Sequence, residues 1–519
     1  MPKCLTLALA CALAFAAPAA VAGPRDAGSG LPPGVRQALA DAGVDEGAMA
    51  AIALPLQHAA PPWQHRARVP MQPASTMKIV TSIVALDRVG PNHRGSTELR
   101  SAAPIAGGVL TGDLVLKGGG DPDLGVPQLW ALLLDLRQAG VHTIDGDLLI
   151  DRSLFNPPRM DIEAPAFDES PEFGYNVIPD ALHLAGHLLP LELKSDSSKV
   201  TASTVPHLPG IVMDASAMTL NPNRACSDWD DDWKPAQVTR GAGASASASS
   251  APKATGTNGI RNSQTSGAAH ITIALQGAYP PNCTQRTGLQ LIDRLELEDQ
   301  LFRTLWNGMG GQLRGRAREA GGPDQSRVLA RRTSRPWGEV LRSMNKSSDN
   351  AHTRLLYLML GVPGGGDTRQ AADRQVRGWL AQHHIDATGL VLDNGSGLSR
   401  TDRITPLQLA SMLKVAHAGR HAAELLVSLP TVGVDGTMRN RLKDSPASGW
   451  ARMKTGTLSN VVALAGYVND AQGRPWAVAM MINHERAASA RPALDALVDH
   501  IARVGFTPVR QIGPLAEGP

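Results

Sequence analysis

Residues 73–78, Pro-Ala-Ser-Thr-Met-Lys, and the apolar run that follows at 79–86 constrain the fold of this chain more than any other stretch. Read as the first turns of a buried helix, they place Ser75 and Lys78 on one face, because residues three apart are neighbours on a helix surface. A lysine that is desolvated inside a protein has a lowered pKa and can take the proton of a serine hydroxyl. The segment therefore predicts a nucleophilic serine with its base one turn away.

The Ser-x-x-Lys spacing does not identify this site by itself. Ser250, Ser343 and Ser411 also precede a lysine by three residues. Ser75 differs because it opens its helix, where free backbone N–H groups and the positive end of the helix dipole can stabilise a developing oxyanion. The alternative interpretation is a helix-capping serine beside an unrelated lysine.

Composition is that of a globular protein with more than one domain. The 519 residues are 43% hydrophobic and 19% charged, and the net charge is +3. Basic residues are interspersed with acidic ones, so no surface for nucleic acid is expected. The chain has no Cys-x-x-Cys and no His-Glu-x-x-His pattern, so we expect no metal site and no cofactor.

Residues 1–22 have the pattern of a secretory signal peptide. A charged start at Lys3 is followed by an apolar stretch and by the small-residue sequence Ala-Val-Ala at 20–22. The apolar stretch is short and Pro18 interrupts it, which argues against a membrane anchor that stays attached. No later run of about 18 apolar residues occurs, so we expect an exported chain that starts at Gly23 and has no integral membrane segment.

Loss of the signal peptide leaves two cysteines, Cys226 and Cys283. An oxidising compartment favours a disulfide between them, closing a loop whose ends are 57 residues apart (283 minus 226). Two free thiols are the alternative. Between the cysteines, residues 241–267 are mostly Gly, Ala, Ser and Thr. This composition cannot bury a core, so we expect a disordered surface loop there.

A second motif, Ser-Asp-Asn at residues 348–350, lies between two segments with helical periodicity. From a loop at this place, Ser348 can relay a proton, and Asn350 can hold either Lys78 or a substrate amide. Asp349 would point away and fix the loop.

The third motif, Lys-Thr-Gly at residues 454–456, precedes the apolar run 461–468. This order predicts an edge strand that pairs with an extended peptide, with Gly456 admitting the substrate backbone. The cation of Lys454 and the hydroxyl of Thr455 can hold a carboxylate. We assign Thr457 to the same substrate-binding strand.

The ordered set Ser-x-x-Lys, Ser-Asp-Asn and Lys-Thr-Gly resembles the signature of serine β-lactamases and penicillin-binding proteins. The chain is most similar to low-molecular-mass penicillin-binding proteins of the D-alanyl-D-alanine carboxypeptidase/endopeptidase type that carry a large insertion between the first two motifs. Here Ser348 follows Lys78 by 270 residues (348 minus 78). Residues 118–122, 175–182, 393–400 and 455–467 also look like this family.

The resemblance implies an α+β fold. A β-lactamase/transpeptidase-like domain, an antiparallel sheet with helices, would be interrupted by two nested smaller domains. The expected boundaries are 23–89 and 336–519 for the catalytic domain, 90–187 and 286–335 for the inserted domain, and 188–285 for the second nested domain.

The resemblance also implies a periplasmic serine hydrolase that cleaves peptidoglycan peptides ending in D-Ala-D-Ala or cross-linked from D-Ala to diaminopimelate, and that β-lactam antibiotics acylate. A β-lactamase would use the same motifs, but class A enzymes add a glutamate for deacylation. No Glu-x-x-Leu-Asn pattern lies between the first two motifs. A non-catalytic cell-wall binding protein is a further alternative, against which the intact Ser75, Lys78 and Lys454 argue.

Overall fold

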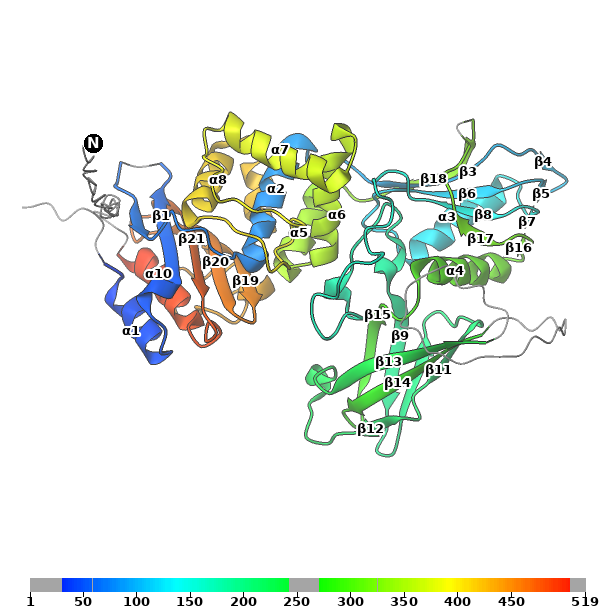
Figure 1. The fold of residues 1–519 in the computed structure, drawn as a ribbon, viewed down its shortest axis with the longest axis horizontal. Helices are drawn as coiled ribbons and strands as arrows, with labels where there is room; N and C mark the ends of the chain where they lie inside the picture. The colour runs from blue at the N-terminus through cyan, green and yellow to red at the C-terminus, as the bar shows by residue number, and fades with distance from the viewer. Residues whose placement is uncertain (1–29, 58, 242–269, 324, 505–519) are drawn as a thin grey trace, which may run out of the picture.

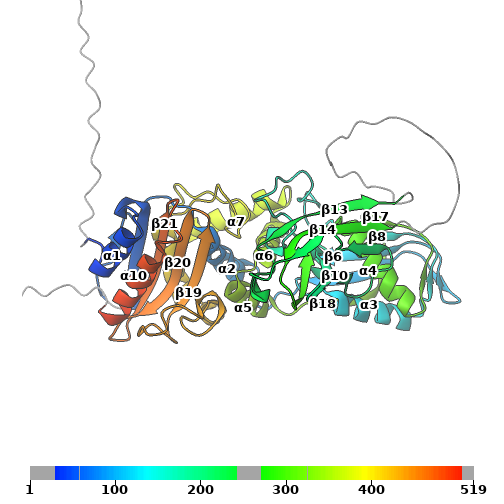
Figure 2. The ribbon, with the colours of Figure 1, turned by 90° about the horizontal axis from the view of Figure 1, so that it is seen from below.

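The computed structural model describes residues 30–57, 59–241, 270–323 and 325–504. The expected signal peptide at 1–22 lies outside the described residues, as does the expected loop at 241–267 apart from Gly241. Among the helices of the described ranges, none is long and apolar enough to cross a lipid bilayer. We call residues 30–89 and 336–504 the terminal half and residues 90–335 the inserted half. The two halves lie side by side in both views (Figures 1 and 2).

An antiparallel five-stranded sheet forms the centre of the terminal half, at the left of Figure 1. In sheet order its strands are Arg452–Leu458 (β19), Val461–Asn469 (β20), Pro475–Asn483 (β21), Met49–Pro55 (β1) and Trp63–His65 (β2). The early strand β1 therefore pairs with the late strand β21, which brings distant parts of the chain into one sheet. Strand β19 is at the edge, where a strand presents unpaired backbone groups.

Alternate residues of the central strands pack into two different cores, as the two-residue period of a strand requires. Ala51, Leu464 and Val478 pack with helices α1 (Pro33–Asp41) and α10 (Arg491–Arg503). Residues of the opposite face, such as Ala463, pack with the other helices. Those helices are Met77–Arg88 (α2), Trp337–Ser347 (α5), Asn350–Gly361 (α6), Thr368–Gln382 (α7), Pro406–Ala418 (α8) and Ala422–Ser428 (α9).

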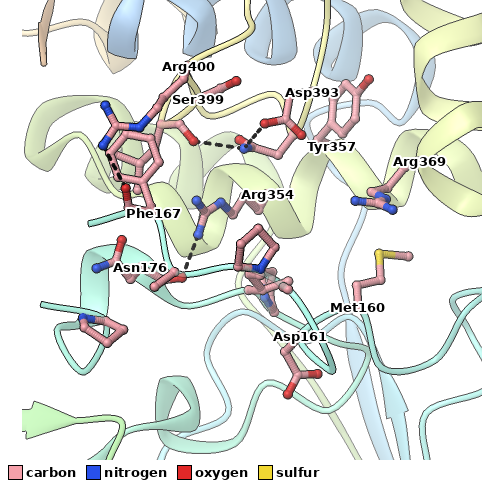
Figure 3. A pocket seen from close by; sticks show the side chains of 18 of the residues that line it. Met160, Asp161, Phe167, Asn176, Arg354, Tyr357, Arg369, Asp393, Ser399 and Arg400 are labelled. Carbon is pink, nitrogen blue, oxygen red and sulfur yellow. Dashed lines mark hydrogen bonds between the residues drawn. The ribbon is translucent and has the colours of Figure 1, made fainter. Parts of the chain in front are cut away.

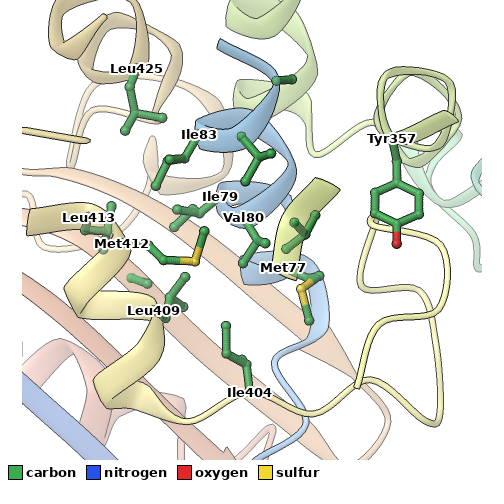
Figure 4. Packing of buried hydrophobic residues seen from close by; sticks show 14 of the residues in the cluster. Met77, Ile79, Val80, Ile83, Tyr357, Ile404, Leu409, Met412, Leu413 and Leu425 are labelled. Atoms are coloured by element: carbon green, nitrogen blue, oxygen red, sulfur yellow. The ribbon is translucent and has the colours of Figure 1, made fainter. Parts of the chain in front are cut away.

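Helix α2 is buried on nearly all sides. Every residue from Met77 to Leu86 is buried. Figure 4 shows Ile79 and Ile83 of α2 facing Leu413 of α8 and Leu425 of α9. Each large apolar side chain buried in this way contributes about 1.5–3 kcal/mol to folding. The start of α2 is therefore a rigid platform for side chains that must be held in place.

The inserted half has a mixed five-stranded sheet covered by two helices. In sheet order the strands are Ala317–Glu319 (β17), Leu148–Asp151 (β8), Leu114–Gly119 (β6), Ser96–Ser101 (β3) and Arg327–Thr333 (β18). The helices Val126–Gln138 (α3) and Arg294–Gly308 (α4) share a core with it that includes Leu116, Leu133 and Phe302. A smaller sheet beside it contains Gln312–Leu313 (β16), Thr143–Ile144 (β7), Val109–Leu110 (β5) and Ile105–Ala106 (β4).

Two further small sheets form the lower right of Figure 1. One contains Val200–Thr204 (β10), Leu189–Ser195 (β9) and Thr284–Leu289 (β15), and the other Ile211–Asp214 (β11), Ile271–Tyr279 (β14), Met218–Leu220 (β12) and Trp233–Arg240 (β13). A disulfide joins Cys226 to Cys283 in this region.

One expected domain boundary, between residues 285 and 286, needs correction. It falls inside β15, which pairs with β9 from Thr284 to Leu289. Because β15 is hydrogen-bonded along its whole length to a strand of the nested unit, it cannot be divided between two domains. We propose that the nested unit extends through Leu289, and we keep the other expected boundaries as proposals.

Candidate active site

Ser75 lies in a single 3-10 turn, Ala74–Thr76, directly before α2 rather than inside it. The side-chain amine of Lys78, in the first turn of α2, lies 3.1 Å from Ser75 Oγ. The same Nζ donates to Asn350 Oδ1 and to the carbonyl oxygen of Ser396, each at 2.6 Å. Lys78 is completely buried. The expected pair is thus formed, and two additional acceptors hold the amine in place.

Burial, with smaller contributions from the charges of Lys454 and Arg354, holds the pKa of Lys78 well below its ordinary value. A neutral amine has two N–H groups and one lone pair. Asn350 Oδ1 and the Ser396 carbonyl can only accept, so they take the two N–H groups. The lone pair of a neutral Lys78 therefore faces the hydroxyl of Ser75, which is the arrangement that a general base requires.

The backbone at Ser75 is held in an uncommon conformation. Ala74, the preceding residue, has a positive φ of 47°. Its carbonyl is covered by Gly397, which has φ 80° and at which an added Cβ would lie 1.9 Å from the Ala74 oxygen. Strained residues persist only where the surrounding structure fixes them, and they concentrate at functional sites. The segment that contains Ser396 and Gly397 therefore holds both the Ser75 turn and the Lys78 amine.

The Ser-Asp-Asn motif is not the loop that we expected, because the two flanking helices almost meet. Ser348 caps the C-terminus of α5 with a left-handed φ of 63°, Asp349 caps the N-terminus of α6, and Asn350 is the first residue of α6. Of the two roles considered for Asn350, the structure shows contact with Lys78. Its Nδ2 group donates to the carbonyl of Tyr175 in the inserted half, at 3.0 Å.

Lys454 forms a second serine–lysine pair. Its Nζ donates to Ser348 Oγ and to the carbonyl of Thr455, both at 2.9 Å. Like Lys78 it is completely buried, and this burial lowers its pKa to about 7. The side chain of Thr455 donates to Thr437 Oγ1 at 2.8 Å. The three motifs thus converge on one site, with Ser348 beside the lysine of the third motif.

Gly456 makes a close contact with the turn that carries Ser75. An added Cβ there would lie 2.7 Å from the carbonyl oxygen of Pro73 and 3.1 Å from the nitrogen of Ser75. The glycine is therefore required where β19 packs directly against the turn that carries Ser75. This contact sets the distance between the edge strand and the nucleophile.

The outer edge of β19 presents free backbone groups next to Ser75. The N–H of Met453 points away from β20 and donates to Pro430 at 2.9 Å. Successive N–H groups of a strand point to opposite sides, so those of Thr455 and Thr457 also face this edge. Thr457 is exposed, and within the described ranges no residue accepts from its N–H.

Sequence reasoning assigned no role to Ser396, Arg354 or Asp402. Arg354 lies one turn after Asn350 on α6, and its Nη1 donates to the carbonyls of Asn176 and Val177 in the inserted half, at 2.9 and 2.6 Å. Burial lowers its pKa to about 10. Asp402 is completely buried, and burial raises its pKa to about 7.

A cavity of about 450 Å³ lies where the inserted half faces α6 and residues 393–401. Figure 3 shows its charged lining, with Asp161 and Arg369 at one side and Arg400 at the other. The guanidinium carbon of Arg400 lies 4.8 Å from the centre of the Phe167 ring, and its Nη2 donates to the Phe167 carbonyl at 2.9 Å. The cavity can therefore bind a polar group of either charge; its lining includes Arg354, one turn after Asn350 on α6, and none of the residues of the three motifs.

Comparison with known proteins identifies the family of this chain. The model of the D-Ala-D-Ala carboxypeptidase 3 (S13) family matches residues 33–504. The chain belongs to this family. A D-alanyl-D-alanine carboxypeptidase of Actinomadura sp. (strain R39) is 30% identical over 412 residues, which are 77% of this chain and 71% of the relative. D-alanyl-D-alanine carboxypeptidase DacB of Haemophilus influenzae is 26% identical over 425 residues, 80% of each chain.

The crystal structure of penicillin binding protein 4 (dacB) from Haemophilus influenzae has the same fold. It matches with a TM-score of 0.70 at 22% identity and covers 90% of this chain and 99% of its own. The resemblance found from the three motifs and the expected α+β fold are therefore confirmed. The protein is a hydrolase of the D-Ala-D-Ala carboxypeptidase family.

Proposed function

We propose that this carboxypeptidase is a serine enzyme that forms an acyl-enzyme on Ser75. The observation that carries the proposal is the buried Lys78 amine, whose two acceptor partners leave its lone pair for the Ser75 hydroxyl. Ser75 Oγ attacks the carbonyl carbon of the penultimate D-Ala while its proton passes to Lys78 Nζ. The C–N bond then breaks as the leaving amine takes this proton from Lys78 by way of the Ser348 hydroxyl. Water next gives a proton to the neutral Lys78 and attacks the ester carbon, and the Ser75 oxygen leaves and takes that proton back from Lys78.

Two backbone N–H groups are suited to stabilise the tetrahedral intermediate. The N–H of Ser75 precedes α2, and the N–H of Thr457 faces the open edge of β19. Within the described ranges neither group donates to another residue. Donors that are already in place cost no reorganisation when charge develops on the substrate oxygen. We assign them as the oxyanion hole.

Substrate recognition would involve the third motif and the neighbouring cavity. Lys454, Thr455 and Thr457 would hold the terminal carboxylate of a D-Ala-D-Ala peptide. The cavity with Asp161, Arg369 and Arg400 suits a diaminopimelate side chain, which carries both an ammonium and a carboxylate. This supports endopeptidase action on cross-linked peptidoglycan in addition to carboxypeptidase action.

Acylation by penicillin and a periplasmic location are also proposed. Penicillin binding protein 4 from Haemophilus influenzae has been solved in complex with a β-lactam, and that structure matches this chain with a TM-score of 0.64. The pattern of a signal peptide at residues 1–22 supports export to the compartment that holds the cell wall.

The proposal is tested by labelling the purified protein with a fluorescent penicillin and by measuring release of D-Ala from a pentapeptide ending in D-Ala-D-Ala. We expect both activities in the parent protein and neither in Ser75→Ala. Ser411→Ala is the matched control, because Ser411 also precedes a lysine by three residues but lies in α8. Labelling that survives Ser75→Ala would contradict the proposal. A cross-linked muropeptide dimer, assayed in parallel, tests the endopeptidase activity.

A further inference from the structure

His352 connects the Ser-Asp-Asn motif to the inserted half. It lies in the first turn of α6, two residues after Asn350. The Nδ1 atom of its ring lies 2.9 Å from Asp349 Oδ2, and its Nε2 lies 3.0 Å from the carbonyl oxygen of Pro122. Its backbone N–H donates to the other carboxylate oxygen of Asp349, also at 2.9 Å. The middle residue of the motif is therefore held from two sides by His352.

Both ring nitrogens of His352 face hydrogen-bond acceptors. The carbonyl of Pro122 cannot donate. Burial by itself would raise the pKa of Asp349, but the hydrogen bonds and the charge of His352 outweigh it and hold that pKa well below its ordinary value, so Asp349 is an ionised acceptor. A neutral imidazole has a single N–H and can satisfy only one of these partners. The two contacts together require the imidazolium form.

We propose that the imidazolium of His352 is a positioning residue that fixes Ser348 and Asn350 by tying Asp349 to the Pro122 carbonyl of the inserted half. Ser348 and Asn350 flank Asp349 and contact Lys454 and Lys78, respectively. Ser348 has a left-handed backbone, which must be held by its surroundings. Loss of the His352 proton removes one of the two ring contacts and loosens the junction of α5 and α6. The inference rests on the proposed function.

The charged and titratable groups around His352 come from three segments. Asp349 is on α6, Asp123 follows β6 and is paired with Arg335 at 2.7 Å, and His183 precedes β9 with its ring centre 5.7 Å from that of His352. Burial, with the neighbouring His352, lowers the pKa of His183 to about 3, so His183 stays neutral in the working range.

These surroundings favour the charged form of His352. Burial would lower its pKa, but Asp349, the Pro122 carbonyl and Asp123 together raise it above its ordinary value. The positioning contact is therefore present at low pH and is lost as the pH rises through the raised pKa.

The test compares penicillin acylation rates of the parent protein and His352→Gln between about pH 5 and pH 9, a range that includes the ordinary histidine pKa. We expect the parent to be faster by about tenfold at the acidic end, the effect of losing one charge-assisted hydrogen bond. The ratio of the two rates should fall toward one at the alkaline end, where the parent has also lost the charge. Because Lys78 and Lys454 are present in both proteins, their titration cancels in this ratio.

Two further variants keep the test decisive. His352→Arg keeps a permanent charge and should remain faster than His352→Gln at the alkaline end. His421→Gln is the matched control, because His421 also faces a carboxylate three residues away in the sequence, that of Glu424 at 3.9 Å, at the start of α9. The ratio of the parent rate to the rate of this variant should be one at every pH.

If the parent acylates faster than His352→Gln by the same factor at every pH, His352 has a structural role only. If the two rates are equal at every pH, His352 has no role in acylation. Either result overturns the inference. A parent protein that penicillin does not acylate would instead contradict the proposed function, so the two failures are distinguishable.

Discussion

The two halves of the molecule bury their charges in opposite ways. In the candidate active site of the terminal half, the completely buried Lys78 and Lys454 contact neutral hydrogen-bonding groups. In the inserted half, the buried Arg152 and Arg294 each contact Asp180, at 2.7 and 2.6 Å. Arg152 also contacts the buried Glu298 at 2.6 Å.

The two arrangements have opposite effects on proton affinity. Burial lowers the pKa of both lysines, and for Lys78 it outweighs the more distant carboxylates of Asp349 and Asp402. Burial also acts to lower the pKa of Arg152, but Glu298 and Asp180 outweigh it and raise that pKa. A catalytic amine must be able to lose its proton, whereas a structural ion pair must keep it. Desolvation therefore lowers the proton affinity of the two lysines in one half, whereas carboxylates compensate for it at Arg152 in the other.

The largest effect should come from Lys78→Arg, which leaves a charge in the active site that cannot be lost. Arginine keeps its proton in proteins, so it cannot serve as the base for Ser75. We expect acylation by penicillin and by peptide to fall by about 10³-fold, the usual contribution of a general base. Stopped-flow or gel-based labelling measures this rate. Lys414→Arg is the control, because Lys414 belongs to a Ser-x-x-Lys pair in α8, and this variant should acylate normally. Acylation of Lys78→Arg at near the parent rate would mean that another group takes the proton.

Lys454→Arg should have a smaller effect, because this lysine is needed for its charge. We expect it to retain part of the activity, with a loss of about tenfold.

Lys454→Ala should lose more activity with a substrate that has a free carboxylate than with its ester. Since burial lowers the pKa of Lys454 to about 7, the affinity for the carboxylate should weaken as the pH rises through that value. Steady-state kinetics with the acid and the ester measure the difference, and equal losses for both would contradict the assignment.

Removing one carboxylate from the buried ion pairs of the inserted half should affect the free energy of unfolding more than the acylation rate. Asp180→Asn leaves Arg152 and Arg294 short of negative charge, which costs about 3 kcal/mol in the free energy of unfolding. Acylation of the folded protein should change by about twofold at most, which is about 0.4 kcal/mol in the activation free energy and far less than the loss expected for Lys78→Arg. Denaturant unfolding monitored by fluorescence provides the stability. Asp231→Asn, which removes an exposed partner of Arg224, is the control and should cost under about 1 kcal/mol. Equal losses in the two variants would show that the cluster does not stabilise the fold.

The smallest effect should come from replacing residues 242–269 by a short turn. Strands β13 and β14 pair up to Arg240 and Ile271, and the N–H of Gly241 donates to the His270 carbonyl at 2.9 Å. The ends to be joined are therefore adjacent, and loop-closure entropy changes slowly with length. We expect an unchanged acylation rate. A severalfold loss would show that this segment contributes to the site.

The sequence predicted the parts of the site that depend on side-chain chemistry and local spacing. Ser75 and Lys78 are one turn apart, and the order of the three motifs identified Ser348 and Lys454. Ser396 was missed because it contributes a backbone carbonyl, for which no residue type is required. Its approach to Lys78 depends on the tertiary contact of Gly397 with the Ser75 turn.

The remaining differences have the same origin in long-range contacts. The role of Gly456 became clear only when β19 was seen against the Ser75 turn. The boundary inside β15 was missed because strand pairing with β9 connects residues far apart in the sequence. The contact of His352 with Pro122 likewise joins the terminal half to the inserted half, 230 residues apart in the sequence. Motif spacing carries no information about such contacts.

The most direct test of the account is to locate the acyl group. Intact mass measurement after penicillin treatment, followed by peptide mapping, should find one adduct, on the peptide that contains Ser75. The adduct should be absent from Lys78→Arg treated in the same way, because its Ser75 has no base. An adduct on the peptide that contains Ser348 or Ser411 would contradict the assignment of Ser75 as the nucleophile.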